Sequence, residues 1–174
     1  MHLINMKKIL SLIVFIYSLA NIVFAQTDLK KWVIASGKVE IMVPENCTIN
    51  SDEKTVAFSQ DAIKSPGSIL SFSMGDENIS DNEIPAFTDD RLKLAQLHDE
   101  SFKYIDDGIH LQDGKNIGYI KFSTKEGKTK YFHYTFFISV DAKPLLFKFS
   151  CPFKQRKRWE AAVDNVANSL RIIQ

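Results

Sequence analysis

The stretch YFHYTFFISV, residues 131–140, decides the fold of this chain. Its side chains alternate with period two, and aromatic or aliphatic residues stand on both sides of the alternation. A strand with one face in water would show a polar side, so the pattern predicts a central strand covered on both faces. Its aromatic side chains are therefore expected in the core rather than in a ligand site.

Two further strand patterns flank this stretch. Residues 117–122 precede it across the sequence KEGK (125–128), and residues 145–151 follow it across DAKP (141–144). The glycine at 127 can supply the positive φ of a tight reversal, and the second connection has the composition of a turn. The three runs are expected to form an antiparallel meander.

A helical pattern follows the meander after Pro152, which cannot donate to a strand ladder and suits the start of a helix. The apolar residues that recur at helical spacing are Trp159, Ala162, Val163, Val166 and Leu170. This helix is expected to lie across one face of the meander. Burial of Trp159 would anchor it and contribute about 2–3 kcal/mol.

The first half of the chain carries weaker patterns. Strands are expected over residues 32–43 with an interruption at Gly37, over 55–58, over 68–74 and, after a helix, over 102–111. The helix has its body over 91–99, and its start is ambiguous between a capping box at Ser80 and Glu83, a first turn at Pro85 and a cap at Thr88. The prediction is an α+β chain with one antiparallel sheet of about six to seven strands flanked by helices.

One domain over residues 26–174, behind a signal peptide over residues 1–25, is the expected organisation. Lys7 and Lys8 precede an apolar run, and Ala25 stands where a signal peptidase would cut. No cysteine follows the run at that point, which favours a soluble exported protein over a lipoprotein. An uncleaved helix that tethers the chain to the inner membrane is the alternative. Cleavage would leave one more acidic than basic residue, which gives no support to nucleic-acid binding.

Two cysteines, Cys47 and Cys151, would reach an oxidising compartment, where a disulfide between them is allowed. The bond would close a loop of about 100 residues and stabilise the fold by several kcal/mol in the chain-entropy model. Two buried free thiols are the alternative, because the Cα separation cannot be read from the sequence.

The sequence shows no catalytic or metal-binding constellation. The three histidines of the mature chain, His98, His110 and His133, fall on different expected elements and have no metal-ligand spacing. No serine stands in a glycine-flanked elbow, and the 7 glycines are scattered. Acidic groups around Asp76 and Asp106 lack the spacing of a calcium loop and are expected to be solvated. No cofactor or metal is therefore expected.

Four basic residues stand at the expected start of the last helix: Lys154, Arg156, Lys157 and Arg158. Each cation there opposes the helix dipole by about a few tenths of a kcal/mol. An anionic partner, such as a lipid head group, an acidic polysaccharide or an acidic protein patch, would explain the arrangement. Solvated side chains that keep the surface soluble are the default alternative.

Three features of the chain together carry a family resemblance. They are a first strand ending in Val43-Pro44-Glu45-Asn46, one mid-chain helix before a long meander, and a last strand leading into a helix that ends Asn168-Ser169-Leu170. Over roughly residues 33–172 the chain resembles the PsbP/Mog-like superfamily. The resemblance implies an α/β/α sandwich and a mostly non-enzymatic role, and exported bacterial members of unknown function are the most similar branch. Cys47 stands where this family often has an aromatic residue, and no site residue is carried over.

These observations favour an exported, non-enzymatic binding or assembly module of the cell envelope, periplasmic or secreted. Its partner would be an envelope protein, an anionic lipid or a polysaccharide. The alternative is a small envelope hydrolase whose histidine and carboxylate meet only in three dimensions. A cleft with two titratable groups within hydrogen-bond reach would favour the enzyme, and a broad exposed apolar or basic surface would favour the binding module.

Overall fold

The computed structural model describes residues 29–45, 47–49, 55–57 and 68–173 of the 174-residue chain. In these residues the strands are β1 (Leu29–Ile34), β2 (Val39–Pro44), β3 (Thr48–Ile49), β4 (Thr55–Ala57), β5 (Ile69–Met74), β6 (Lys103–Gln112), β7 (Lys115–Glu126), β8 (Thr129–Val140), β9 (Lys143–Pro152) and β10 (Arg171–Ile172). The helices are α2 (Ile84–His98) and α3 (Arg156–Ala167), and a short 3-10 turn precedes each. Neither helix is long and apolar enough to cross a bilayer. The signal peptide expected over residues 1–25 lies outside the described residues.

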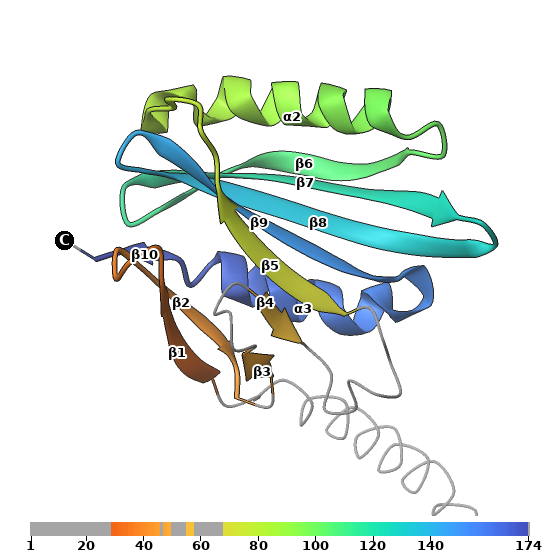
Figure 1. The fold of residues 1–174 in the computed structure, drawn as a ribbon, viewed down its shortest axis with the longest axis horizontal. Coiled ribbons are helices and arrows are strands. Elements are labelled where there is room, and N and C mark those ends of the chain that lie inside the picture. Colours follow the sequence, from red (N-terminus) through yellow and green to blue (C-terminus); the bar gives the residue numbers. More distant parts are fainter. Residues whose placement is uncertain (1–28, 46, 50–54, 58–67, 174) are drawn as a thin grey trace, which may run out of the picture.

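The strands form two antiparallel sheets. The large sheet has the order β3-β4-β5-β9-β8-β7-β6, and the small sheet has the order β1-β2-β10. Figure 1 shows α2 above the large sheet and α3 below it. The predicted meander is confirmed, because β8 lies between β7 and β9 and pairs antiparallel with both. The described chain is thus an α+β sandwich with one helix on each face of its large sheet.

The expectation of one sheet is wrong at the amino terminus. Residues expected as a single interrupted strand form the hairpin β1-β2, in which Trp32 pairs with Ile41. β10 then joins β2 through the pair Arg171 and Glu40, after the last helix. A strand of two residues is too short to show a period-two pattern, so the sequence could not reveal it.

Tight turns join the strands of the meander as expected. The β6–β7 turn has positive φ at Asp113 (48°) and Gly114 (74°), and Gly127 takes φ 58° between β7 and β8. The β8–β9 turn has positive φ at Asp141 (52°) and Ala142 (58°). Such primed turns match the twist of adjoining strands, and they fix the register of all three hairpins.

The main core lies on the α3 side of the large sheet. Phe136 and Phe147 stack there with ring centroids 4.7 Å apart, from adjacent strands. Trp159 of α3 is 7% exposed, and its indole N–H donates to Oε1 of Gln155 at 3.1 Å. The predicted anchoring of the last helix by this tryptophan is therefore confirmed.

The other helix covers only part of the opposite face. Two of the expected start signals operate together, because the Ser80 N–H donates to Oε2 of Glu83 at 2.8 Å and Pro85 lies in the first turn of α2. The buried residues of α2 all lie in its first five positions, and Leu97 near its end is 82% exposed. The expectation that both faces of the central strand are covered is thus wrong for part of β8, where His133 remains only half-buried. The sequence pattern could not show where the helix stops covering the sheet.

A close approach at Gly118 fixes where α2 meets the sheet. A Cβ atom at this position would lie 2.3 Å from Cε2 of Phe137 and 2.4 Å from Oγ1 of Thr88. Phe137 packs edge-on against Phe87 of α2, with centroids 5.1 Å apart. Only a residue without a side chain lets β7, β8 and α2 pack this closely.

Candidate ligand-binding groove

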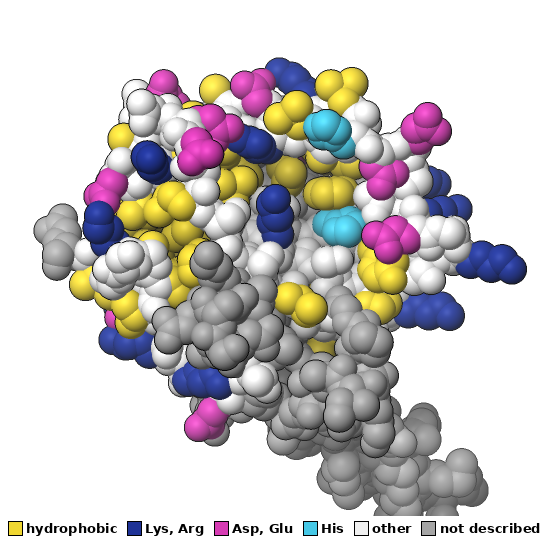
Figure 2. Space-filling view, viewed as in Figure 1, with side chains coloured by type: hydrophobic (Ala, Val, Ile, Leu, Met, Phe, Trp, Pro, Cys, Tyr) yellow, Lys and Arg dark blue, Asp and Glu magenta, His cyan; other side chains and the backbone are white. Residues whose placement is uncertain are grey.

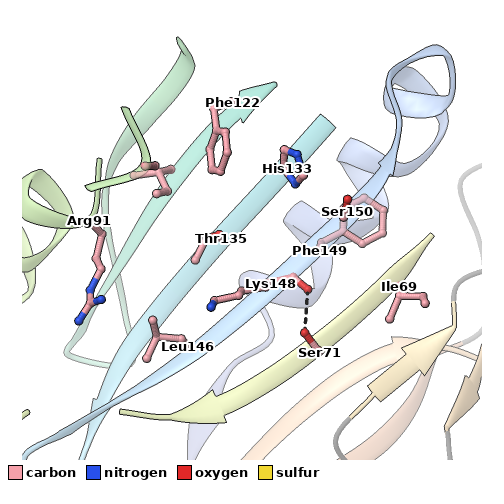
Figure 3. Close-up of a pocket in the computed structure, with 12 residues that line it drawn as sticks. Ile69, Ser71, Arg91, Phe122, His133, Thr135, Leu146, Lys148, Phe149 and Ser150 are labelled. Carbon is pink, nitrogen blue, oxygen red and sulfur yellow. Dashed lines mark hydrogen bonds between the residues drawn. The ribbon is translucent and has the colours of Figure 1, made fainter. Parts of the chain in front are cut away.

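The uncovered part of the α2-side face is a groove of about 490 Å³. Its floor is made by adjacent strands β5, β9, β8 and β7, and α2 contributes Arg91 and Ala95 to one wall (Figure 3). Hydrophobic, basic and histidine side chains lie on this hollowed side of the molecule in Figure 2. The volume falls in the range of about 300–1,000 Å³ that is usual for small-ligand sites.

Strand register places the floor residues in two rows that run across the strands. The first row is Ile69, Ser150, His133 and Phe122, and the second row is Ser71, Lys148, Thr135 and Ile120. Both rows belong to one face, because residues two apart on a strand point to the same side. The floor therefore combines apolar side chains, three hydroxyl groups and one lysine.

Aromatic rings build one end of the first row. The His133 ring stacks on Phe122 with centroids 4.9 Å apart, and Phe122 stacks on Phe102 at 5.1 Å. Nε2 of His133 lies 2.8 Å from Oγ1 of Thr124, so the predicted packed and hydrogen-bonded histidine is confirmed. Burial lowers the pKa of His133 more than the charges of Glu126 and Asp99 raise it. The ring is therefore neutral near pH 7 and adds to a flat, weakly polar surface.

Two cations reach the groove, and their surroundings differ. Arg91 forms an ion pair with Glu77, and its guanidinium lies 4.5 Å from the centroid of the Phe87 ring. Lys148 is exposed, and no carboxylate of the described residues forms an ion pair with its ammonium. The groove lining includes no aspartate, glutamate or cysteine within the described ranges. Its charge is therefore positive, and Lys148 is the less compensated of its two cations.

Of the four basic residues expected as an anion site, Arg156, Lys157 and Arg158 lie in the first turn of α3 and Lys154 lies in the 3-10 turn before it, and their surroundings differ. Arg156 makes two hydrogen bonds to Glu160, at 2.7 and 3.1 Å, and lies over the Phe132 ring. The other three are exposed, with Arg158 over the ring of Trp159 at 4.6 Å. An ion pair within α3 thus removes Arg156 from the set available to a partner, and Lys154, Lys157 and Arg158 remain.

Both cysteines are free and buried in the structure. Burial raises the pKa of Cys47 to about 11, against a smaller opposing effect of Lys30, and burial with the charge of Glu160 raises the pKa of Cys151 to about 12. The structure therefore has the arrangement given by the second alternative, two buried thiols. Thiols with such pKa values hold little thiolate at neutral pH and are poor nucleophiles.

The other histidines and the acidic groups considered from the sequence do not come together as a catalytic or metal site in the described residues. Of the other histidines, His98 is exposed on α2 and His110 lies on β6. Among the described residues, no group of three or more histidine, cysteine, aspartate or glutamate side chains is arranged to hold a metal ion. The acidic groups serve local contacts instead: Glu77 pairs with Arg91, and Asp107 accepts a hydrogen bond from the Tyr104 hydroxyl at 2.8 Å.

Sequence reasoning missed two features, namely Lys148 in the groove and a buried lysine, Lys121, on the opposite face. Both lysines fall inside expected strands, Lys121 in 117–122 and Lys148 in 145–151, and neither was singled out as a candidate site residue. A signal existed for Lys148, since it stands between Phe147 and Phe149, and the structure places this strand, β9, in the middle of the large sheet. Only the position of α2 shows that it faces a hollow rather than open surface.

Two helices on opposite faces of a large antiparallel sheet, with a small sheet beside it, define an α+β protein with the PsbP/Mog-like fold. The fold expected from the sequence is therefore confirmed at this level. Solved structures similar to the chain include cyanobacterial PsbP (CyanoP) from Synechocystis sp. PCC 6803, with TM-score 0.58 and 11% identity over 86% of this chain and 95% of that one. LpqN of Mycobacterium tuberculosis, described as involved in cell envelope biogenesis, has TM-score 0.57 and 13% identity over 84% and 91%. A mutant of Mog1 has TM-score 0.51 and 10% identity over 84% and 97%.

No family model matches the chain, and no curated protein matches it. At identities of 10 to 13%, the likeness to these structures concerns the fold. A fold of this kind is compatible with many functions, so the function has to be argued from the groove.

Proposed function

We propose that this chain is an exported, non-enzymatic binding or assembly module of the cell envelope, and that the groove between α2 and β5 is its ligand site. The observation that carries this proposal is the open half of the sheet face. There a hollow of about 490 Å³ exposes apolar, hydroxyl and basic side chains that α2 leaves uncovered. A protein that only needed stability would extend the helix contacts over this face, because burying apolar area stabilises by about 25 cal/mol per Å².

Export and an envelope role have separate support. The amino-terminal sequence has the features of a signal peptide over residues 1–25, followed by a single domain over 26–174. LpqN, which has the same fold, is described as involved in cell envelope biogenesis. Amino-terminal sequencing of the mature protein tests this part: a start at Gln26 supports export, and a retained Met1 favours a membrane-tethered chain.

The hydrolase alternative has less support from the groove. An envelope hydrolase needs a base and a nucleophile, or two carboxyl groups, within hydrogen-bond reach of one another. The groove lining within the described ranges has no carboxylate, and Nε2 of its histidine is taken by Thr124. The two thiols belong to the core and have raised pKa values. This arrangement suits retention of a ligand better than its chemical conversion.

The exposed cations at the start of α3 are proposed as a second contact, for an anionic envelope partner. They are Lys154, Lys157 and Arg158, without Arg156, which is engaged by Glu160. Within the described part of the chain these three cations have no carboxylate partner, so they attract anions at low ionic strength, and salt weakens that attraction.

A groove-filling variant tests the ligand site. Thr135 lies in the middle of the floor, half-buried, and tryptophan is favoured in strands, so Thr135→Trp fills the hollow without breaking the sheet. The protein is purified from its native envelope, and native mass spectrometry measures any co-purified small molecule. We expect a bound mass on the wild type and its loss in Thr135→Trp.

Thr129→Trp, at an exposed position of the same strand, is the matched control and keeps the bound mass. Equal retention of the mass by Thr135→Trp, with an unchanged circular dichroism spectrum, would show that the ligand lies elsewhere. A wild-type protein that carries no small molecule after gentle extraction would also count against the groove as a ligand site.

A further inference from the structure

The middle of the groove carries one positively charged side chain, Lys148, with hydroxyl groups on both sides of it. Register places Lys148 directly between Ser71 on β5 and Thr135 on β8. The Ser71 hydroxyl donates weakly, at 3.4 Å, to the backbone oxygen of Lys148, and the Thr135 hydroxyl has no partner among the described residues. In Figure 3 the Lys148 side chain runs over the floor on the side of Thr135 and Leu146. An anionic group there would gain one charge-assisted hydrogen bond and neighbouring hydroxyl donors.

The second cation limits the charge of the ligand. Arg91 already has Glu77 as its partner, and its guanidinium packs on Phe87. One uncompensated positive charge matches one negative charge on the ligand. A carboxylate carries one negative charge at neutral pH, whereas a phosphate monoester carries between one and two. The charge balance therefore favours a carboxylate.

The rest of the floor is suited to an apolar body. Ile69 is 43% exposed at one end of the first row, and the stacked rings of Phe122 and His133 form the other end. Leu146 lies beside Lys148 in the lining. Three strand spacings separate the ends of the row, which is about 14 Å. A ligand of this length would contact apolar side chains at both ends while its head group reaches the second row.

From this arrangement we infer that the groove binds a small amphipathic carboxylate, whose anionic head pairs with Lys148 and whose apolar body lies across Ile69, Leu146 and Phe122. The inference rests on the proposed function of the groove as a ligand site, and adds the chemical class of the ligand. Lys148 decides between charged and neutral ligands, and the apolar row supplies contact area that both would share.

The test compares two probes of the same shape, 4-phenylbutyrate and its neutral amide, 4-phenylbutyramide. Each is titrated into ¹⁵N-labelled protein, and the shifts of backbone amides on β8 and β9 give the dissociation constants. We expect the acid to bind at least about tenfold more tightly than the amide, since a charge-assisted hydrogen bond contributes about 1.5–3 kcal/mol. Lys148→Met removes the charge and keeps an unbranched side chain that is one atom shorter, and we expect it to remove this preference.

Lys143→Met, an exposed position on the same strand, is the matched control and retains the preference. Equal affinities of acid and amide for the wild type would overturn the inferred ligand class while leaving the groove as a site. Shifts confined to residues outside the groove, or no binding of either probe, would also overturn it. Loss of preference in Lys148→Met, together with unchanged amide affinity, would support it. The proposal that the groove is a ligand site is tested separately, by the loss of the bound mass in Thr135→Trp. Failure of that proposal can therefore be distinguished from failure of the inferred ligand class.

Discussion

The ammonium of Lys121 lies 2.9 Å from Oδ1 of Asp164, joining the large sheet to α3 through a side chain that is only 9% exposed. Glu160 lies 3.4 Å from the same ammonium, and the Tyr134 ring centroid is 4.6 Å away. Burial lowers the pKa of Lys121, but the hydrogen bonds and charges of Asp164 and Glu160 outweigh it, and the net effect is a raised pKa. The lysine is therefore charged at neutral pH and depends on its two carboxylates.

We expect Lys121→Met to lower the free energy of unfolding by about 1–2 kcal/mol. Removing one member of a fully buried pair costs about 3–5 kcal/mol, and the 38% exposure of Asp164 reduces this loss because water can solvate the carboxylate. Urea denaturation measures the change. A double-mutant cycle with Asp164→Asn isolates the pair, and a coupling free energy near zero would show that Lys121 contributes only through packing.

Arg156 should contribute more to the free energy of unfolding than the three basic residues around it. Arg156→Gln removes two hydrogen bonds to Glu160 and the contact with the Phe132 ring, so we expect a loss of about 1 kcal/mol in the free energy of unfolding. The combined variant Lys154→Gln, Lys157→Gln and Arg158→Gln should change stability by less than about 0.5 kcal/mol per site. The same triple variant should bind anionic vesicles more weakly at low salt, and unchanged vesicle binding would remove the second proposed contact.

Gly118→Ala should destabilise the fold by about 1–3 kcal/mol, because the added methyl group overlaps Phe137 and Thr88 at the contact between α2 and the sheet. Thermal unfolding followed by circular dichroism measures the effect. Adding Phe137→Leu, which opens space at the overlap, should recover part of the loss. A Gly118→Ala protein as stable as the wild type would mean that α2 moves away from β7 at little cost.

Ala142→Gly should raise the free energy of unfolding by about 0.5–1 kcal/mol. Ala142 has φ 58°, a left-handed conformation that costs an L-residue with a Cβ atom about 1–2 kcal/mol, and glycine offsets part of this gain through its entropy in the unfolded chain. Ala142→Val, with a β-branched side chain at the same φ, should destabilise. Chemical denaturation of both variants provides the measurement. A loss of stability in the glycine variant would show that the left-handed conformation of Ala142 does not strain the fold.

Stability should fall as the pH drops from 7 towards 5, and His133 should account for part of the fall. Burial lowers its pKa below the ordinary value of 6.5, against smaller opposing effects of Glu126 and Asp99. The unfolded chain then binds a proton near pH 6.5 that the folded chain does not. The contribution of this group is fully present above pH 6.5 and is lost as the pH falls towards the folded pKa.

His133→Phe keeps a flat ring and removes the titration, so the slope of stability against pH should become smaller. Some slope should remain, because burial also lowers the pKa of His110 more than Asp164 raises it. An identical slope in wild type and His133→Phe, measured by urea denaturation from pH 5 to 7.5, would assign the pH dependence to other groups.

The sequence predicted the parts of the fold that depend on neighbours along the chain. Period-two patterns and turn residues identified β7, β8 and β9, and helical spacing identified α3 with Trp159 at its anchor. The same reasoning failed for the hairpin β1-β2, because the interruption at Gly37 was taken as a break within one strand, whereas the chain reverses there between two strands. It also failed for β8, where an apolar second face predicted full coverage and the structure leaves His133 and Thr135 half-buried.

By itself, the sequence determined an α+β chain with an antiparallel meander, a packed last helix and the basic run at its start. These features follow from local periodicity and turn chemistry, which act between residues a few positions apart. Only the tertiary structure decided that α2 covers one part of the sheet and leaves a groove over Lys148. It also decided that Lys121 meets Asp164. Those outcomes depend on how elements distant in sequence pack against one another. For α2, the close approach that Gly118 permits sets the distance between the helix and the sheet.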